Sequence, residues 1–414
     1  MWWAMVRPVE RLMVRRRKRR GRVYLSDTTL RDGEQMAGVR LGPDAKLAIA
    51  RALAEAGIDS IDAGFPAASA EERDAIRRIV AGVRGPVVTA LCRTASADID
   101  HAADALAGGA AYKTGVTLFV GVSPAHRRLK LAKTRAEVVR MTVEAVQYAR
   151  RTFRIVAVGA EDASRAEPEF LHEVYREAIA AGASTVGFAD TLGILTPEKA
   201  ADRVKAIQDG VPELAEALLA VHFHDDLGLG TANALACVAA GANIVQGTIN
   251  GLGERAGNTP LEEVALALAL HRDQYRARAR LDLRRLRDLG ALVSRLTGVA
   301  VPPNKAVVGA NLFVTEAGIH QDGLLKDAST YLPYPPEAVG AGGVRLALGK
   351  HSGRHAVHHR LEGRGWAPDE GQVLRVLDHL KGRPRRAVYV TEAEIDELVD
   401  EVFGDTSALA RVGP

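Results

Sequence analysis

Short apolar runs alternate with longer amphipathic segments along most of the chain, and this alternation limits the possible folds more than any other feature. Each run has four to six residues, as buried strands do, and the segments between the runs repeat apolar residues at helical spacing. We expect the first two helices at 43–56 and 71–83. The expected strands are 22–26, 60–63, 87–91, 114–119, 155–158, 185–188, 219–224 and 244–248.

Eight strands that alternate with helices predict a parallel sheet, because each helix returns the chain to the same end of the sheet. Their even spacing favours closure into an α/β fold of the (β/α)₈ (TIM) barrel type, which we place at residues 23–285. Glycines at 57, 109, 182 and 241 stand just before four of the strands, where we expect them to end the preceding helices.

The pattern changes after residue 285. Pro302 and Pro303 and the cluster at 333–336 interrupt regular elements, so 286–345 is expected to be a connector subdomain. Residues 346–414 are charged and helical in pattern, with a last helix expected at 391–403. We predict that they form a mostly helical C-terminal subdomain.

Positive charge is concentrated at the start of the chain. Nine of the 55 Lys and Arg, but only one of the 51 Asp and Glu, lie in residues 1–22. The remaining residues therefore carry 46 basic and 50 acidic side chains, which argues against nucleic acid as a partner. Like charges in one block repel each other, so we expect 1–22 to be a disordered basic tail.

The distribution of apolar residues and the number of cysteines argue against a membrane-spanning protein and against a disulfide-rich one. No run of 18 apolar residues is present, so we expect no membrane span. Cys92 and Cys237 are too few for a disulfide framework and have no cysteine neighbour at metal-ligand spacing. We expect both to be small buried side chains in a protein of the reducing cytoplasm.

Polar residues at the ends of two expected strands indicate a metal site. His222 and His224 are two residues apart on a strand, so their side chains point to the same face. The first strand is followed by DTTLRDGEQ, which contains Asp32. Working residues of a barrel lie at the carboxyl ends of its strands, and two imidazoles with one carboxylate suit Mg, Mn, Zn or Co. Asn258, in NGLGERAGN after the eighth strand, either completes this shell or belongs to an ordinary glycine-rich loop.

Two polar clusters lie beyond the barrel. His320 and Tyr331 stand in EAGIHQDGLLKDASTY, and LGKHSG occupies 348–353. A histidine near a tyrosine suggests acid–base work, but polar residues on the surface of a proline-rich connector would give the same pattern.

As a set, these motifs resemble the metal-dependent family of isopropylmalate, citramalate and homocitrate synthases, with nitrogen-fixation-type homocitrate synthases the most similar. The resemblance covers residues 25–353. It is carried by DTTLRDGEQ, GFPAAS, EDASRAEPEF, FADTLG, HFHDDLGLGTANALA, NGLGERAGNTPLEE, EAGIHQDGLLKDASTY and LGKHSG.

The resemblance implies a role for each matching position. Asp32, His222, His224 and Asn258 would hold a divalent metal ion that binds a 2-oxo acid. Arg31 would stabilise the developing oxyanion, Thr191 would hold the substrate carboxylate, and Gln35 and Arg93 would line the same mouth. His320 and Tyr331 would reach in from the partner subunit to remove the methyl proton of acetyl-CoA.

Two positions depart from the family pattern. Asp62 replaces the usual glutamate of the second strand, so a carboxylate that would support the His–Tyr pair is one methylene shorter. Ala157 stands where lysine-pathway homocitrate synthases carry an arginine for the distal carboxylate of 2-oxoglutarate. Nitrogen-fixation-type enzymes also lack that arginine.

The resemblance implies a cytoplasmic homodimeric acyltransferase of biosynthesis, an acyl-CoA:2-oxo acid C-acyltransferase. The main prediction is homocitrate synthase, which uses acetyl-CoA and 2-oxoglutarate. The alternatives are 2-isopropylmalate synthase using 2-oxoisovalerate, or a synthase for another acid such as a phosphonate-bearing one. A lyase of the same barrel family and a non-catalytic relative are disfavoured by the synthase motifs and the complete metal set. We expect no leucine-regulated domain after the helical region.

Overall fold

The computed structural model describes residues 21–382 and 392–403. The chain divides into two compact units at Val301 and Pro302. Most of the basic tail predicted at 1–22 lies outside the described residues.

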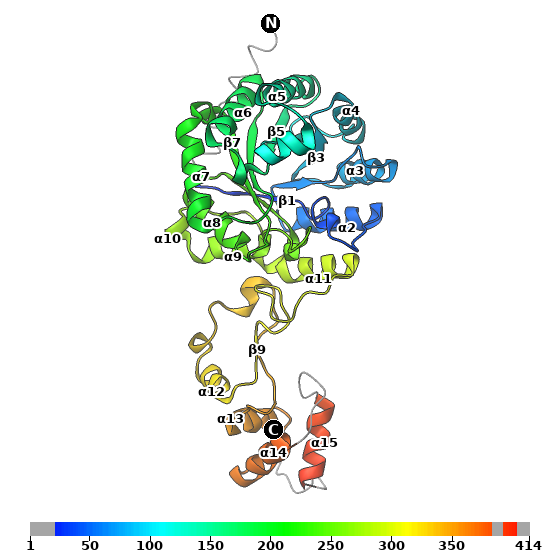
Figure 1. The fold of residues 1–414 in the computed structure, drawn as a ribbon. Helices are drawn as coiled ribbons and strands as arrows, with labels where there is room; N and C mark the ends of the chain where they lie inside the picture. The colour runs from blue at the N-terminus through cyan, green and yellow to red at the C-terminus, as the bar shows by residue number, and fades with distance from the viewer. Residues whose placement is uncertain (1–20, 383–391, 404–414) are drawn as a thin grey trace. The chain divides into compact units, whose positions relative to one another are not determined.

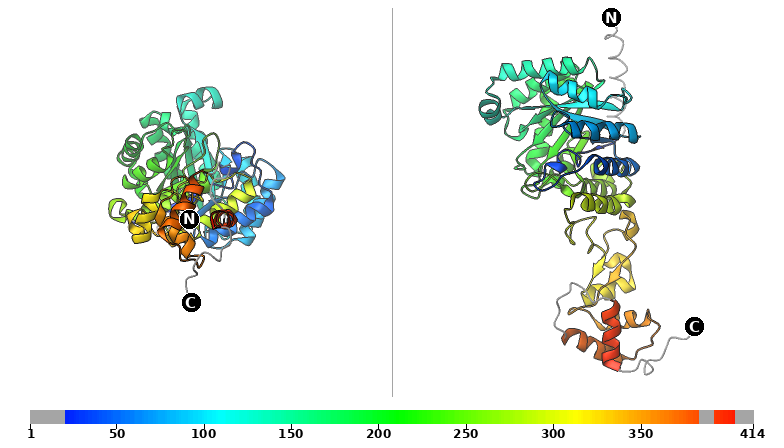
Figure 2. Two further views of the ribbon diagram at one scale, coloured as in Figure 1. Left: turned by 90° about the horizontal axis from the view of Figure 1, so that it is seen from below. Right: turned by 90° about the vertical axis from the view of Figure 1, so that its right-hand side faces the viewer.

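Eight parallel strands close into a barrel in the order of the sequence, with β8 paired to β1, as the alternation predicted. The helices of this unit surround the strands (Figures 1 and 2). The strands are β1 (Tyr24–Asp27), β2 (Ser60–Asp62), β3 (Val87–Arg93), β4 (Thr114–Gly121), β5 (Ile155–Glu161), β6 (Thr185–Asp190), β7 (Leu218–Phe223) and β8 (Ile244–Gly247). The helices are α2 (Pro43–Glu55), α3 (Ala70–Gly82), α4 (Ser96–Ala105), α5 (Arg135–Ala149), α6 (Pro168–Ala181), α7 (Pro197–Gly210), α8 (Gly230–Ala239), α9 (Leu261–Leu270), α10 (Arg272–Tyr275) and α11 (Leu286–Thr297).

Local sequence signals set the ends of these helices. Proline stands in the first turn of α2, α6 and α7, where its missing N–H costs nothing. Thr134 and Glu137 cap α5 reciprocally. Gly57, Gly182 and Gly241 adopt the left-handed backbone expected at helix ends. The fourth expected glycine is displaced by one residue, because Gly108 rather than Gly109 takes the positive φ.

Small side chains leave the barrel interior open. Ser26, Ser60, Gly159, Gly187 and Ala220 line a cavity of about 870 Å³ inside the sheet. Apolar side chains behind the strands, such as Val186, Val221 and Phe223, are fully or almost fully buried. The stable core therefore lies between strands and helices, and the interior is available for ligands.

The barrel unit extends beyond residue 285, where the sequence prediction ended it. Helix α11 packs against α2 and against the short 3₁₀ turn Ile249–Gly251 that follows β8. One face of α11 buries Leu286, Leu289 and Val293, which ties this helix to the barrel.

The second unit holds its own apolar core in its helical part. Its elements are β9 (Val314–Thr315), α12 (Gly318–Lys326), β10 (Arg345–Leu346), α13 (Arg354–Glu362), α14 (Glu370–Gly382) and α15 (Glu392–Phe403). Leu361, Leu377 and Leu398 belong to one buried cluster that joins α13, α14 and α15. Among the described residues, no helix combines the length and apolarity needed to cross a membrane.

Candidate metal centre at the carboxyl end of the barrel

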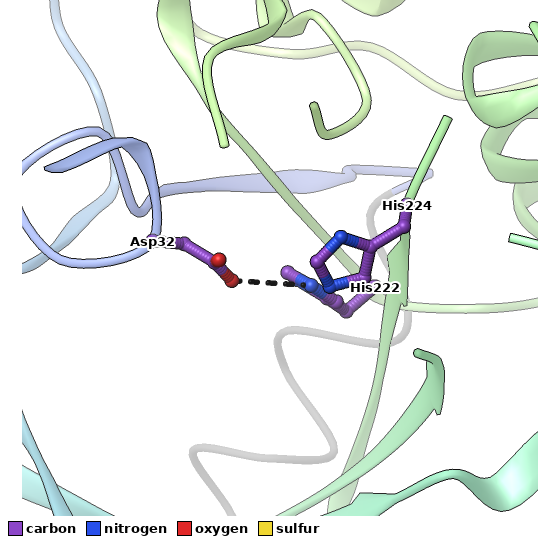
Figure 3. A group of neighbouring side chains, drawn as sticks. All are labelled: Asp32, His222 and His224. Atoms are coloured by element: carbon purple, nitrogen blue, oxygen red, sulfur yellow. Dashed lines mark ion pairs between the residues drawn. The ribbon is translucent and has the colours of Figure 1, made fainter. Parts of the chain in front are cut away.

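Asp32, His222 and His224 come together at the carboxyl ends of β1 and β7. Their ligand atoms lie within 4.8 Å of one another, and all three residues are buried. Nε2 of His222 lies 3.3 Å from Oδ2 of Asp32. Figure 3 shows the two imidazoles projecting from one strand toward the carboxylate, which comes from the loop after β1. The structure thus brings together the three residues that the sequence pattern indicated.

Burial keeps the two imidazoles neutral. It lowers the pKa of His222 to about 3 and also lowers that of His224, which leaves nitrogen lone pairs available at neutral pH. Burial alone would raise the pKa of Asp32, but the adjacent Arg31 guanidinium outweighs it, and the value is about 2. The carboxylate is therefore ionised and the two imidazoles are neutral, as a divalent metal site requires.

Asn258 lies beside His224, to which its backbone is bridged. Its Nδ2 donates to the carbonyl oxygen of Leu252 at 2.9 Å, which fixes the amide, and its Oδ1 is buried without a hydrogen-bond partner. An orphaned oxygen is costly unless a ligand satisfies it. One carboxylate and two neutral imidazoles form a donor set that fits a divalent metal ion, and this free oxygen is a fourth candidate donor.

Arg31 is fixed between two carboxylates next to this group. Its Nε donates to Oδ2 of Asp62 at 2.8 Å, and its Nη1 lies 3.0 Å from Oδ2 of Asp32. Asp62 is buried, and burial raises its pKa although Arg31 opposes this. No sequence pattern indicated this pairing. The predicted support of the His–Tyr pair by Asp62 stays a prediction.

Three further predicted residues differ in their relation to the cavity. Gln35 and Thr191 line it together with Arg31, Asp32, His222 and His224. The Thr191 hydroxyl accepts from the backbone N–H of Asp162 at 2.9 Å, so its own proton remains to be donated. Arg93, at the end of β3, is not among the lining residues, because Asp98 holds its guanidinium in a two-point ion pair.

His320 and Tyr331 lie together in the second unit. Their ring centroids are 4.2 Å apart, and both side chains are exposed. Gly323 allows this stacking, because a Cβ there would lie 2.6 Å from Cε2 of Tyr331. The structure therefore places this pair on one exposed surface of α12 and the turn after it.

The LGKHSG motif forms a turn against the start of α12. The carbonyl oxygen of His351 accepts from Gly318, and Ser352 Oγ donates to the carbonyl oxygen of Glu316. A Cβ at Gly349 would lie 2.1 Å from the Glu316 carboxylate. These contacts give the motif a structural role in supporting the helix that carries His320.

Both cysteines are buried and free, as expected. Burial raises their pKa values, so both thiols stay protonated and unreactive.

Fold and site together define a (β/α)₈ barrel enzyme with a candidate divalent-metal centre at the carboxyl ends of its strands. The HMGL-like family model matches residues 22–293, and the model for the homocitrate synthase post-HMGL domain matches residues 307–386. The chain belongs to the HMGL-like family. The prediction that it is a condensing acyltransferase is confirmed at the level of the enzyme class.

Curated relatives cover nearly the whole chain. It is 44% identical to the 2-isopropylmalate synthase of Geobacillus sp. (strain WCH70), with 92% of this chain and 73% of the relative aligned. It is 42% identical to the 2-isopropylmalate synthase of Pyrococcus abyssi, with 94% and 80% aligned. Among solved structures, the HMG-CoA lyase of Bacillus subtilis matches 68% of this chain and 96% of its own, with a TM-score of 0.58 at 20% identity. That likeness supports the barrel fold alone.

Proposed function

We propose that the chain condenses acetyl-CoA with a 2-oxo acid that carries an apolar branched side chain, 2-oxoisovalerate, and so acts as a 2-isopropylmalate synthase. The observation that carries this proposal is the buried Asp32–His222–His224 group beside Arg31 at the mouth of the barrel. The relatives favour this acceptor over 2-oxoglutarate, and so favour the alternative from the sequence over the main prediction.

The charges around the cavity support the apolar acceptor. At the carboxyl ends of the strands, the described cations that line the cavity are Arg31 and Lys130. Arg31 is engaged by Asp32 and Asp62, and Nζ of Lys130 lies 2.7 Å from Oε1 of Glu161. A distal carboxylate would have to compete with these pairs, whereas an isopropyl group meets the nearby Ala157 and Gly159 without such a cost.

The residues around the metal centre would divide the work as follows. A bound divalent ion, whether Mg, Mn, Zn or Co, would polarise the keto group as a Lewis acid. Arg31 would stabilise negative charge on the keto oxygen, since its guanidinium is already oriented by two carboxylates. The Thr191 hydroxyl would donate a hydrogen bond to the substrate carboxylate.

Proton removal from the acetyl-CoA methyl group falls to His320 in this proposal, with Tyr331 stacked beside it. We propose that the pair acts in the barrel of a partner subunit, so the working unit is a homodimer. The enolate would form the new bond to the keto carbon, and water would then cleave the thioester and release CoA.

Purified protein with Mg²⁺ or Mn²⁺ and acetyl-CoA tests the proposal. The acceptors would be 2-oxoisovalerate, 2-oxoglutarate and a phosphonate-bearing 2-oxo acid, with thiol release as the signal. We expect fastest CoA release with 2-oxoisovalerate. Preference for 2-oxoglutarate would overturn the acceptor, and no CoA release with any acid would overturn the condensing reaction.

A further inference from the structure

A fully buried lysine lies close in sequence to the loop that carries Arg31 and Asp32. Lys46, on α2, has a side-chain exposure of 0%. Its Nζ lies 2.6 Å from Oε2 of Glu34 and 2.6 Å from Oε2 of Glu72. Glu34 stands in the 3₁₀ turn Gly33–Gln35 that directly follows Asp32, and Glu72 stands in the first turn of α3.

Each of these two carboxylates also binds a loop through its second oxygen. Oε1 of Glu34 accepts from the backbone N–H of Leu41 at 2.8 Å, which closes the loop between the turn and α2. Oε1 of Glu72 accepts from the backbone N–H of Phe65 at 3.0 Å, in the loop after β2. The three side chains therefore connect the loops after β1 and β2 to the helices α2 and α3.

The packing around this group has little slack. A Cβ at Gly64 would lie 1.8 Å from Oε1 of Glu72, so the glycine of the GFP motif permits the close approach. A buried ammonium ion is costly unless it is paired and hydrogen-bonded. Two carboxylates in fixed positions meet that requirement, and any shift of the turn would break one of the short contacts.

We propose that Lys46, with Glu34 and Glu72, is a positioning residue for the candidate metal centre. It fixes the turn Gly33–Gln35 and so holds the preceding residues Arg31 and Asp32 in place against His222 and His224. Lys46 is not among the residues that line the cavity, so it acts through the turn and not by touching a ligand. The inference rests on the proposed function, because it concerns the same site.

The inference is tested with two variants of the full chain, Lys46→Met and Lys46→Gln. Titration calorimetry without substrates measures their Mn²⁺ affinity. Removing a positive charge near a divalent cation would by itself strengthen binding. We expect the opposite, about 10- to 100-fold weaker binding, as when an outer-shell partner of a metal ligand is lost. We also expect a lower kcat with a KM for acetyl-CoA that changes less. Lys46→Gln serves if Lys46→Met does not fold.

Asp59→Asn is the matched control. Asp59 forms a partly buried ion pair with Arg22 at the opposite end of the barrel and accepts from the N–H of Leu25. We expect a lower Tm in this variant and unchanged Mn²⁺ affinity. Lys46 variants that lose Tm but bind Mn²⁺ as the wild type does would overturn the inference. His222→Ala that binds Mn²⁺ normally would instead overturn the metal site itself, so the two failures are distinguishable.

Discussion

The candidate metal centre combines side chains from separate parts of the chain, and burial leaves them in the protonation states that metal ligands need. His222 and His224 are neutral because burial disfavours their charged forms, and Asp32 is ionised because the Arg31 guanidinium offsets its burial. The sequence predicted this group because strand periodicity places two residues at i and i+2 on one face. The sequence did not decide whether Asn258 is a metal ligand or part of an ordinary loop. The structure adds that its Oδ1 is buried without a hydrogen-bond partner.

His222→Ala should abolish both turnover and tight Mn²⁺ binding, since it removes one of two imidazole ligands from a site with few donors. Far-UV circular dichroism should stay unchanged, because the ring faces the cavity. The control is His271→Ala, which removes an exposed imidazole outside the site and should alter neither quantity. A His222→Ala variant with normal CoA release would refute the metal assignment.

Thr191→Val should raise the KM for the 2-oxo acid by about tenfold or more, because a hydrogen bond to a charged group contributes about 1.5–3 kcal/mol. The valine also leaves the N–H of Asp162 without its present acceptor. Thr191→Ser keeps the hydroxyl and should recover most of the affinity. Steady-state kinetics with varied 2-oxo acid makes the comparison, and equal KM values in both variants would exclude the hydroxyl as a carboxylate ligand.

Residue patterns could not predict which side chains far apart in the sequence form pairs. Glu34, Lys46 and Glu72 are separated by 12 and 26 positions and follow no metal or catalytic spacing. The packing of α2 against α3 brings Lys46 to Glu72, and the turn after β1 adds Glu34. Likewise, the pairing of Asp62 with Arg31 follows from the neighbouring positions of β1 and β2.

At the level of elements, the alternation of apolar runs and helices predicted all eight barrel strands and their order. Parallel strands joined by helices leave few other arrangements, which is why the prediction succeeded. The end of the barrel unit was harder to place, because an amphipathic helix such as α11 has the same pattern whether it covers a barrel or belongs to a connector.

The loop after β8 shows how one glycine can position Asn258, a candidate metal ligand. A Cβ at Gly253, whose φ is +154°, would lie 2.0 Å from Nδ2 of Asn258. Gly253→Ala should therefore push the amide away and weaken Mn²⁺ binding about tenfold or more, by analogy with the loss of other supporting contacts. Calorimetric titration measures the change.

Gly108→Ala is the control for this substitution, because Gly108 also has a positive φ, +84°, but nothing lies within 4 Å of its Cβ position. It should cost about 1 kcal/mol of stability through backbone strain and leave Mn²⁺ affinity unchanged. Equal Mn²⁺ affinities in both variants would show that contact with Asn258 does not control the site.

For the whole molecule, the residues of the proposed reaction are divided between the two units. The barrel unit holds the candidate metal ligands, and the second unit holds His320 and Tyr331 on an exposed surface together with Ile319, which is 80% exposed. Because the side chains of His320 and Tyr331 are exposed, another chain can reach them without any rearrangement of the second unit. This supports the proposed homodimer, in which each barrel receives His320 from its partner.

Mixing two inactive variants tests this arrangement. His222→Ala and His320→Ala protomers, unfolded together and refolded at equal amounts, should form mixed dimers in half of the cases by statistical pairing. In a mixed dimer, the barrel of the His320→Ala protomer keeps His222 and receives an unmutated His320 from its partner. The other barrel carries both lesions. Total CoA release should therefore recover to about a quarter of the wild-type value, an estimate that follows from two-fold symmetry. If His320 instead served the barrel of its own chain, every site would carry one lesion and the mixture would stay inactive.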